Sequence, residues 1–387
     1  MRLLTFIRPG LVLALCFVLV APGGALADDD DDESFDPEAA SEALQLGQDH
    51  LEAGRHAEAA DAFWAASGAD GRRFEAHVGY QVASLENGTK VDDLKADYDS
   101  FVEDYPKDVA YLLHRIRLDK AKDRPEALKQ LRKEHRDAAL MIDVETAYAY
   151  LATGDTTAAV KVLKGPAKKG DVRAVGLLVQ AYTRAGKLKA IAKTAKPHLA
   201  DRTVLRETAR AALAGEQWED ALGLAEQMAA LSPGSTAAIL IRAEALERSG
   251  KRKAAIDTLT AGRRTTDDAT PVLLALAGLV ERVEDDGKAL DEAAALYDIV
   301  LGREAEHARA LYGLAWVREQ QEQFTDAEKL YRKAAEVLPD DPAPIESIGY
   351  VLFLQDKIEE AQAQFKRAID LDPKYASAYA NLGATFD

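Results

Sequence analysis

Residues 342–373 read PAPIESIGYVLFLQDKIEEAQAQFKRAIDLDP. Apolar and small residues recur in this stretch every three or four positions, which is the spacing of one face of an α-helix. The stretch therefore predicts a pair of helices joined by a short turn. Its key positions are Ile345, Ile348, Gly349, Leu352, Ala361, Phe365, Ala368 and Pro373.

The same residue types recur one period of 34 residues earlier and later in the chain. The earlier set is Leu311, Leu314, Ala315, Ala327, Tyr331, Ala334 and Pro339, and the later set is Tyr379, Leu382, Gly383 and Phe386. Near the N-terminus the positions are filled by Leu46, Gly47, Gly54, Ala59, Phe63 and Ala66. A helical pair cannot bury its apolar face alone, so we expect consecutive pairs to stack into one array.

This pattern resembles the tetratricopeptide repeat family, whose signature has a Leu-Gly pair on a first helix and small-aromatic-small positions on a second. The resemblance implies an all-α fold, an α-solenoid of stacked antiparallel helix-turn-helix hairpins that forms a right-handed superhelix. We expect small residues at close helix contacts and aromatic rings between hairpins. These residues are Ala59, Ala327 and Ala361, and Phe63, Tyr331 and Phe365.

The repeats divide the chain into units of similar length. They are expected at 40–73, 74–106, 107–139, 140–171, 172–201, 202–235, 236–270, 271–307, 308–341 and 342–375. The units in 40–270 are degenerate, those in 271–375 match well, and a terminal helix occupies 376–387. We expect Pro125 in the first turn of a second helix and a longer turn at Glu284–Gly287.

Residues 1–27 have the features of an export signal. Arg2 and Arg8 precede an apolar run from Leu11 to Ala21. After the run, Ala25-Leu26-Ala27 offers the small residues that a signal peptidase reads. The run is shorter than the roughly 20 residues that span a bilayer as a helix. We expect cleavage before Asp28, no transmembrane span afterwards, and a periplasmic or secreted protein.

Residues 28–39 begin with Asp28–Asp32 and Glu33, a run of like charges that repel one another. We expect this segment to be an acidic disordered tail. Cys16 is the one cysteine of the chain and lies in the expected signal, so neither a disulfide nor a cysteine-ligated zinc site is expected.

Composition and motifs argue against several classes of protein. The 387 residues include 49 Lys+Arg and 66 Asp+Glu, a net charge of -17, which does not favour a nucleic-acid binder. No two of the seven histidines have the i, i+4 spacing of a helical metal site. Phosphate-binding loops, nucleophile elbows and dinucleotide-binding motifs are absent from the sequence. We expect no enzyme, catalytic residue, cofactor or metal.

The resemblance implies a partner-binding surface on the concave side of the array, formed by the first helices. Tyr312, Trp316, Tyr350 and Phe353 occupy the positions that point into it. Aromatic side chains are frequent anchors of interfaces. The alternative is that these four rings pack between hairpins. The family's clamp for carboxyl-terminal peptides is not expected, because its Lys and Asn positions are not filled.

The middle of the chain is basic although the whole chain is acidic. Between Lys161 and Lys196 the sequence has ten basic residues and the single acid Asp171. The ten are Lys161, Lys164, Lys168, Lys169, Arg173, Arg184, Lys187, Lys189, Lys193 and Lys196. They could hold an anionic lipid, an envelope polymer or the acidic tail, or they could serve only as a solvated surface.

The sequence thus favours a non-enzymatic interaction scaffold of the bacterial cell envelope that binds partner proteins on its concave face. One alternative is a carrier or sensor for a polyanion or glycan, with the basic middle as its site. Another is the regulatory arm of a longer enzyme, because the sequence ends at Asp387 soon after a first helix begins.

Overall fold

The computed structural model describes residues 37–52, 56–69, 74–266, 269–283 and 287–386. These residues form α-helices, one short 3₁₀ helix and their connecting turns, without a strand among them. The all-α repeat fold is confirmed. The chain divides into two compact units, 1–215 and 216–387.

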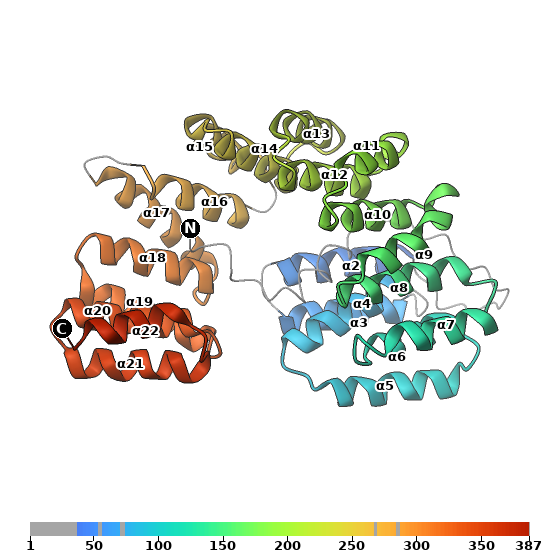
Figure 1. The fold of residues 1–387 in the computed structure, drawn as a ribbon, viewed down its shortest axis with the longest axis horizontal. Helices are drawn as coiled ribbons and strands as arrows, with labels where there is room; N and C mark the ends of the chain where they lie inside the picture. Colours follow the sequence, from blue (N-terminus) through green and yellow to red (C-terminus); the bar gives the residue numbers. More distant parts are fainter. Residues whose placement is uncertain (1–36, 53–55, 70–73, 267–268, 284–286, 387) are drawn as a thin grey trace. The chain divides into compact units, whose positions relative to one another are not determined.

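The first unit is a series of helical hairpins (Figure 1). Its helices are α2 (Pro37–Glu52), α3 (His56–Ala69), α4 (Phe74–Glu86), α5 (Val91–Asp104), α6 (Val109–Arg117), α7 (Arg124–Glu134), α8 (Ala139–Ala152), α9 (Thr156–Lys168), α10 (Val172–Arg184), α11 (Leu188–Ala195), the 3₁₀ helix η1 (Lys196–His198) and α12 (Arg202–Ala214). Pro125 lies in the first turn of α7, as expected.

The second unit continues the same pattern. Its helices are α13 (Trp218–Leu231), α14 (Thr236–Arg248), α15 (Arg252–Gly262), α16 (Thr270–Val280), α17 (Lys288–Arg303), α18 (Ala308–Gln320), α19 (Phe324–Val337), α20 (Pro342–Leu354), α21 (Ile358–Leu371) and α22 (Ala376–Ala384). Each expected repeat contains two of the described helices, and α22 follows the last repeat.

The core is built from the small and aromatic positions of the repeat. Phe63 and Phe365 are almost completely buried, as is Tyr331, and Ala327 and Ala361 have no exposed surface. The Phe365 ring packs on the backbone of Gly349, where an added Cβ would lie 2.7 Å from the ring. Glycine on the first helix therefore lets the aromatic ring of the second helix approach the backbone.

The turn within several hairpins contains a residue with left-handed backbone geometry. Glycine takes this conformation at Gly88, Gly154, Gly186 and Gly250. Glu216, Glu322 and Asp356 have φ angles of 57°, 59° and 61° at the corresponding place in their repeats. Gly88 thus lies in the turn that joins α4 to α5.

The first helices often begin with a side chain that accepts a hydrogen bond from a backbone N–H. Asp341 accepts one from Ala343 at 2.8 Å, and Asp171 accepts one from Ala174 at 2.8 Å. Such caps satisfy amides that have no partner within the helix. Asp341 is thus the N-terminal cap of α20.

Three expected features lie wholly or partly outside the described residues. They are the export signal at 1–27, the acidic run Asp28–Glu33 and the longer turn at Glu284–Gly287. Helix α2 begins at Pro37, within the segment 28–39 expected to be a tail. The compact units divide at Gly215/Glu216, inside the expected repeat 202–235 and not where the repeat matches improve.

Candidate functional site

The four aromatic residues expected to contact a partner lie on two first helices of the second unit. Tyr312 and Trp316 are on α18, and Tyr350 and Phe353 are on α20. Tyr350 is 37% exposed, whereas the other three are only partly exposed. Leu354, which lies four residues after Tyr350 on the same face of α20, is 40% exposed. The most open part of this surface therefore lies on α20.

Tyr312 joins two neighbouring hairpins. Its hydroxyl lies 2.9 Å from the hydroxyl of Ser347 on α20, and its ring meets the Tyr331 ring edge-on with centroids 5.2 Å apart. Burial raises the pKa of the Tyr312 hydroxyl to about 12. The Tyr312 side chain therefore mainly packs between hairpins, which is the alternative that the sequence left open for the four aromatic residues.

Trp316 and Phe353 have mixed environments. Trp316 packs against the core cluster built from α14 to α18, while Phe353 packs against the core of the last hairpins. Both rings keep part of their surface open. We name the set Trp316, Tyr350, Phe353 and Leu354 the first-helix surface.

Buried carboxylates next to the first-helix surface were not expected from the sequence. Glu346 on α20 is 6% exposed, and its Oε1 accepts hydrogen bonds from Ser377 at 2.6 Å and Asn381 at 2.5 Å. These donors lie on α22, so the contacts tie two consecutive first helices together.

A second carboxylate, which is partly buried, belongs to Glu319 on α18. The Tyr331 hydroxyl donates to its Oε2 at 2.8 Å, and burial raises the pKa of the Glu319 carboxyl. Tyr297 and Glu281 form a similar pair at 2.9 Å. Tyrosine in place of phenylalanine at the core aromatic position is the sequence signal that could have indicated these acceptors, because a buried hydroxyl needs a partner.

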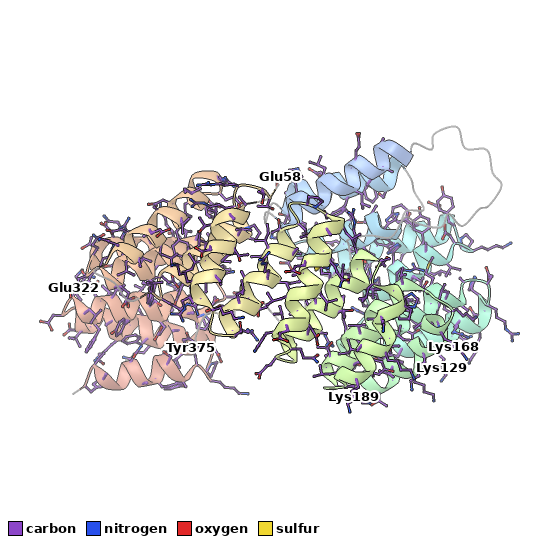
Figure 2. The ribbon with its side chains drawn as sticks, turned by 90° about the horizontal axis from the view of Figure 1, so that it is seen from above. Glu58, Lys129, Lys168, Lys189, Glu322 and Tyr375 are labelled. Atoms are coloured by element: carbon purple, nitrogen blue, oxygen red, sulfur yellow. The ribbon has the colours of Figure 1, made fainter. Side chains whose placement is uncertain are left out.

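The basic middle segment forms a second candidate surface, on α9, α10 and α11 of the first unit. Of its ten residues, all except the partly buried Arg173 are exposed. Arg173 pairs with Asp171 at 3.4 Å, and Arg184 donates to the backbone oxygen of Leu151 at 2.8 Å. The two arginines therefore have structural contacts, and the eight lysines form the open part of the segment. Figure 2 shows Lys168 and Lys189 at the same edge of the first unit.

An aromatic cluster in the first unit was missed in the sequence. Trp64 lies 4.9 Å from Tyr80 and 6.0 Å from Phe101, and Phe101 stacks on Tyr111 at 5.2 Å. Trp64 is 44% exposed. The rings come from α3, α4, α5 and α6. Because the repeat pattern is weak in this region, the sequence did not indicate which positions of neighbouring helices are in contact.

Two classes of site lack support within the described ranges. No helix there is both long and apolar enough to pass through a bilayer. The same residues contain no group of three His, Cys, Asp or Glu side chains that could hold a metal ion.

Comparison with family profiles identifies the repeats. A tetratricopeptide repeat profile matches residues 44–109 and 285–342, and a TPR repeat profile matches residues 349–386. These segments include the hairpins α2–α3 and α4–α5 and the strongly repeating C-terminal part of the chain.

Two curated relatives match parts of the chain. A TPR repeat-containing protein of Pseudomonas aeruginosa is 28% identical over 145 residues, which are 37% of this chain and 24% of the relative. The CTR9 homolog of Arabidopsis thaliana is 30% identical over 95 residues, 24% of this chain and 9% of the relative. The matched segments thus span at most about a quarter of either relative.

Solved structures with similar folds include other repeat proteins. MamA from Desulfovibrio magneticus is 16% identical, with a TM-score of 0.39 over 45% of this chain and 96% of that chain. A tetratricopeptide repeat protein from Parabacteroides merdae is 16% identical, with a TM-score of 0.45 over 64% and 99% of the two chains. The helical hairpins, their core positions and the matching profiles together show that this chain contains tetratricopeptide repeats.

Proposed function

We propose that the protein is a non-enzymatic scaffold of the bacterial cell envelope that binds partner proteins on the first-helix surface. The tetratricopeptide repeats support the general role of a protein-interaction scaffold. The proposal adds the surface that is used and the compartment in which binding takes place.

The exposure of α20 carries the proposal. Tyr350 and Leu354 have large open side chains four residues apart on one helical face, and Phe353 lies three residues after Tyr350, beside them. The hydroxyls of Tyr312 and Ser347 are hydrogen-bonded to each other, and Ser377 and Asn381 donate hydrogen bonds to the Glu346 carboxylate. These contacts hold the neighbouring first helices in place. A surface ordered before binding loses little conformational entropy when a partner docks.

The compartment is inferred from the sequence alone. The apolar run at Leu11–Ala21 and the small residues at Ala25–Ala27 support export and cleavage. N-terminal sequencing of the protein from fractionated bacteria should give Asp28 as the first residue, and the protein should be in the envelope fraction. Cytoplasmic protein that begins at Met1 would contradict this part of the proposal.

Photo-crosslinking tests the surface. A photoreactive amino acid in place of Tyr350 should give a discrete crosslinked protein in living cells. The same group in place of Lys366, which is exposed on α21 and carries none of the first-helix surface, is the matched control. Equal products at both positions, or none at Tyr350, would reject the first-helix surface as the docking site.

Once a partner is captured, substitution measures the contribution of each ring. Tyr350→Ala should weaken binding about fivefold or more, because aromatic rings at the centre of an interface contribute about 1 kcal/mol or more. Tyr312→Phe should change binding less, since Tyr312 mainly contacts Ser347 and Tyr331 within the protein. Titration calorimetry with circular dichroism as the folding control gives both values.

A further inference from the structure

The lysines of α9 and α11 face away from the core of the first unit. On α9, Ala159 and Leu163 are buried, and Lys161, Lys164 and Lys168 lie on the opposite side of the helix. Their spacing of three and four residues places the three side chains in one row. All three are exposed to solvent.

Helix α11 repeats this arrangement one hairpin later. Ile191 and Ala195 are buried, while Lys189 and Lys193 are exposed on the other side, as is Lys196 at the start of the adjoining η1. Helices α9 and α11 both pack against α10. We name these two rows, Lys161, Lys164, Lys168, Lys189, Lys193 and Lys196, the outer lysine face.

The outer lysine face is not neutralised within the part of the chain that the structure describes. No carboxylate there lies within 4.0 Å of any of its six ammonium groups. The basic residues of α7 differ, because Lys129 pairs with Glu126 at 3.2 Å and Arg132 pairs with Asp143. The positive charge of α9 and α11 is therefore open to an external anion.

The chemistry of the face favours a diffuse array of negative charges over a protein interface. Between Leu140 and Leu231 the described residues include no exposed large hydrophobic side chain, so the face lacks the buried apolar anchor of a protein hot spot. The lysine ammonium group is a strongly hydrated point charge. It lacks the fork of N–H donors with which arginine binds a single carboxylate or phosphate. Attraction to such a face is mainly Coulombic and is weakened by salt.

We propose that the outer lysine face binds an anionic membrane surface, with α9 and α11 lying against the lipid headgroups and no side chain inserted into the hydrocarbon. The remaining surface of this chain of net charge -17 is repelled by anionic lipids. Binding therefore fixes which side of the first unit points toward the membrane. The proposal does not depend on the first-helix surface and stands if that surface binds nothing.

Vesicle sedimentation tests the proposal. The probe is large unilamellar vesicles of phosphatidylcholine with one quarter phosphatidylglycerol, and pure phosphatidylcholine vesicles are the neutral control. The protein is the chain without residues 1–27, which precede every described helix. We expect binding to the anionic vesicles at 50 mM NaCl, loss of binding at 300 mM NaCl, and none to neutral vesicles.

Substitution locates the binding face. The triple variant Lys161→Gln, Lys164→Gln, Lys168→Gln should bind about 100-fold more weakly, since each lysine near an anionic bilayer contributes about fivefold. The triple variant with Arg at the same positions should bind like the unmodified protein. Lys333→Gln, Lys366→Gln and Lys374→Gln together remove the same charge from exposed sites of the second unit and should have little effect.

The outcomes separate the membrane from other anionic partners. Equal binding of the Gln variant and the unmodified protein, or equal binding to neutral vesicles, would overturn the proposal. It would also be overturned if a soluble polyglutamate peptide bound the unmodified protein while anionic vesicles did not, because the face would then serve an acidic protein segment. Circular dichroism of each variant excludes loss of the helical fold as the cause.

Discussion

Gly349 is the residue at which the close contact between first and second helices can be tested. A Cβ at this position would lie 2.7 Å from Phe365 Cε1 and 3.2 Å from the backbone oxygen of Ala361. Gly349→Ala should destabilise the protein by about 1–3 kcal/mol through overpacking, although alanine favours helices. Urea unfolding measures the change.

Gly223 is the matched control, since it lies within α13 and an added Cβ would meet nothing within 4 Å. Gly223→Ala should stabilise the protein by up to about 1 kcal/mol. A Gly349→Ala protein as stable as the unmodified one would show that Phe365 can move away at little cost.

His114 is a buried residue that makes stability depend on pH. It has no exposed surface, and its pKa lies well below the ordinary value because of burial, followed by the neighbouring His77 and Arg117. The unfolded state, with a pKa near 6.5, therefore binds a proton more readily than the folded state. Its contribution to stability is complete above pH 6.5 and falls as the pH decreases below that value.

His114→Gln should reduce this dependence. Below pH 6.5 the free energy of unfolding of the unmodified protein should fall by up to about 1.4 kcal/mol per pH unit because of this residue. Urea unfolding between pH 5 and pH 8 should give a smaller slope for the variant. Parallel curves would mean that His114 is protonated equally in both states.

At the scale of the helical hairpin, the turn residue Glu322 is a site of backbone strain. It connects α18 to α19 with a φ of 59°, which is unfavourable for residues that have a Cβ. Glu322→Gly should stabilise the protein by about 0.5–1 kcal/mol, because relief of strain exceeds the added entropy of the unfolded chain. Thermal unfolding gives the difference.

Gly250 provides the reverse comparison at the equivalent turn, where φ is 82°. Gly250→Ala should destabilise the protein, because alanine is strained in this conformation. If both variants lowered stability, the side chain of Glu322 would have a stabilising role greater than the strain of its backbone.

The hairpins could be predicted from the sequence because their determinants are local. The spacing that links Ala327 to Tyr331 and Ala361 to Phe365 lies within one helix, and the turn follows at a constant distance. The spacing of the lysines on α9 and α11 was visible for the same reason. Whether those lysines had carboxylate partners could not be predicted, since such partners come from other helices.

The environment of the candidate partner surface depended on contacts between hairpins. Tyr312 was expected to be open to a partner, but its hydroxyl reaches Ser347, which is on the next hairpin. The acceptor role of Glu346 likewise requires Ser377 and Asn381. Burial of this kind depends on how neighbouring repeats are aligned, so the sequence of a single repeat does not predict it.

At the scale of the whole molecule, the core clusters fall within the two compact units. One cluster extends from Val144 to Ala211 in the first unit, and two others cover Ala243–Val317 and Ala315–Ala378 in the second. Repeat proteins are stabilised mainly by neighbouring hairpins. We therefore expect residues 216–387 to fold when they are produced alone.

Circular dichroism and urea unfolding check this expectation. The segment should be as helical per residue as the full chain and should unfold cooperatively. A segment with low helicity and no transition would show that α13 and its neighbours need the first unit for their stability.

The equal length of the last two repeats, 308–341 and 342–375, gives the gene a simple way to change the protein. Removal of the codons for Pro342–Tyr375 would join Asp341 directly to Ala376, so that Tyr379, Leu382 and Gly383 would take the places of Ile345, Ile348 and Gly349. Recombination between similar repeats would thus shorten or lengthen the array by whole hairpins while each junction keeps its buried contacts. Natural variants of this protein can differ in reach without the appearance of a new fold.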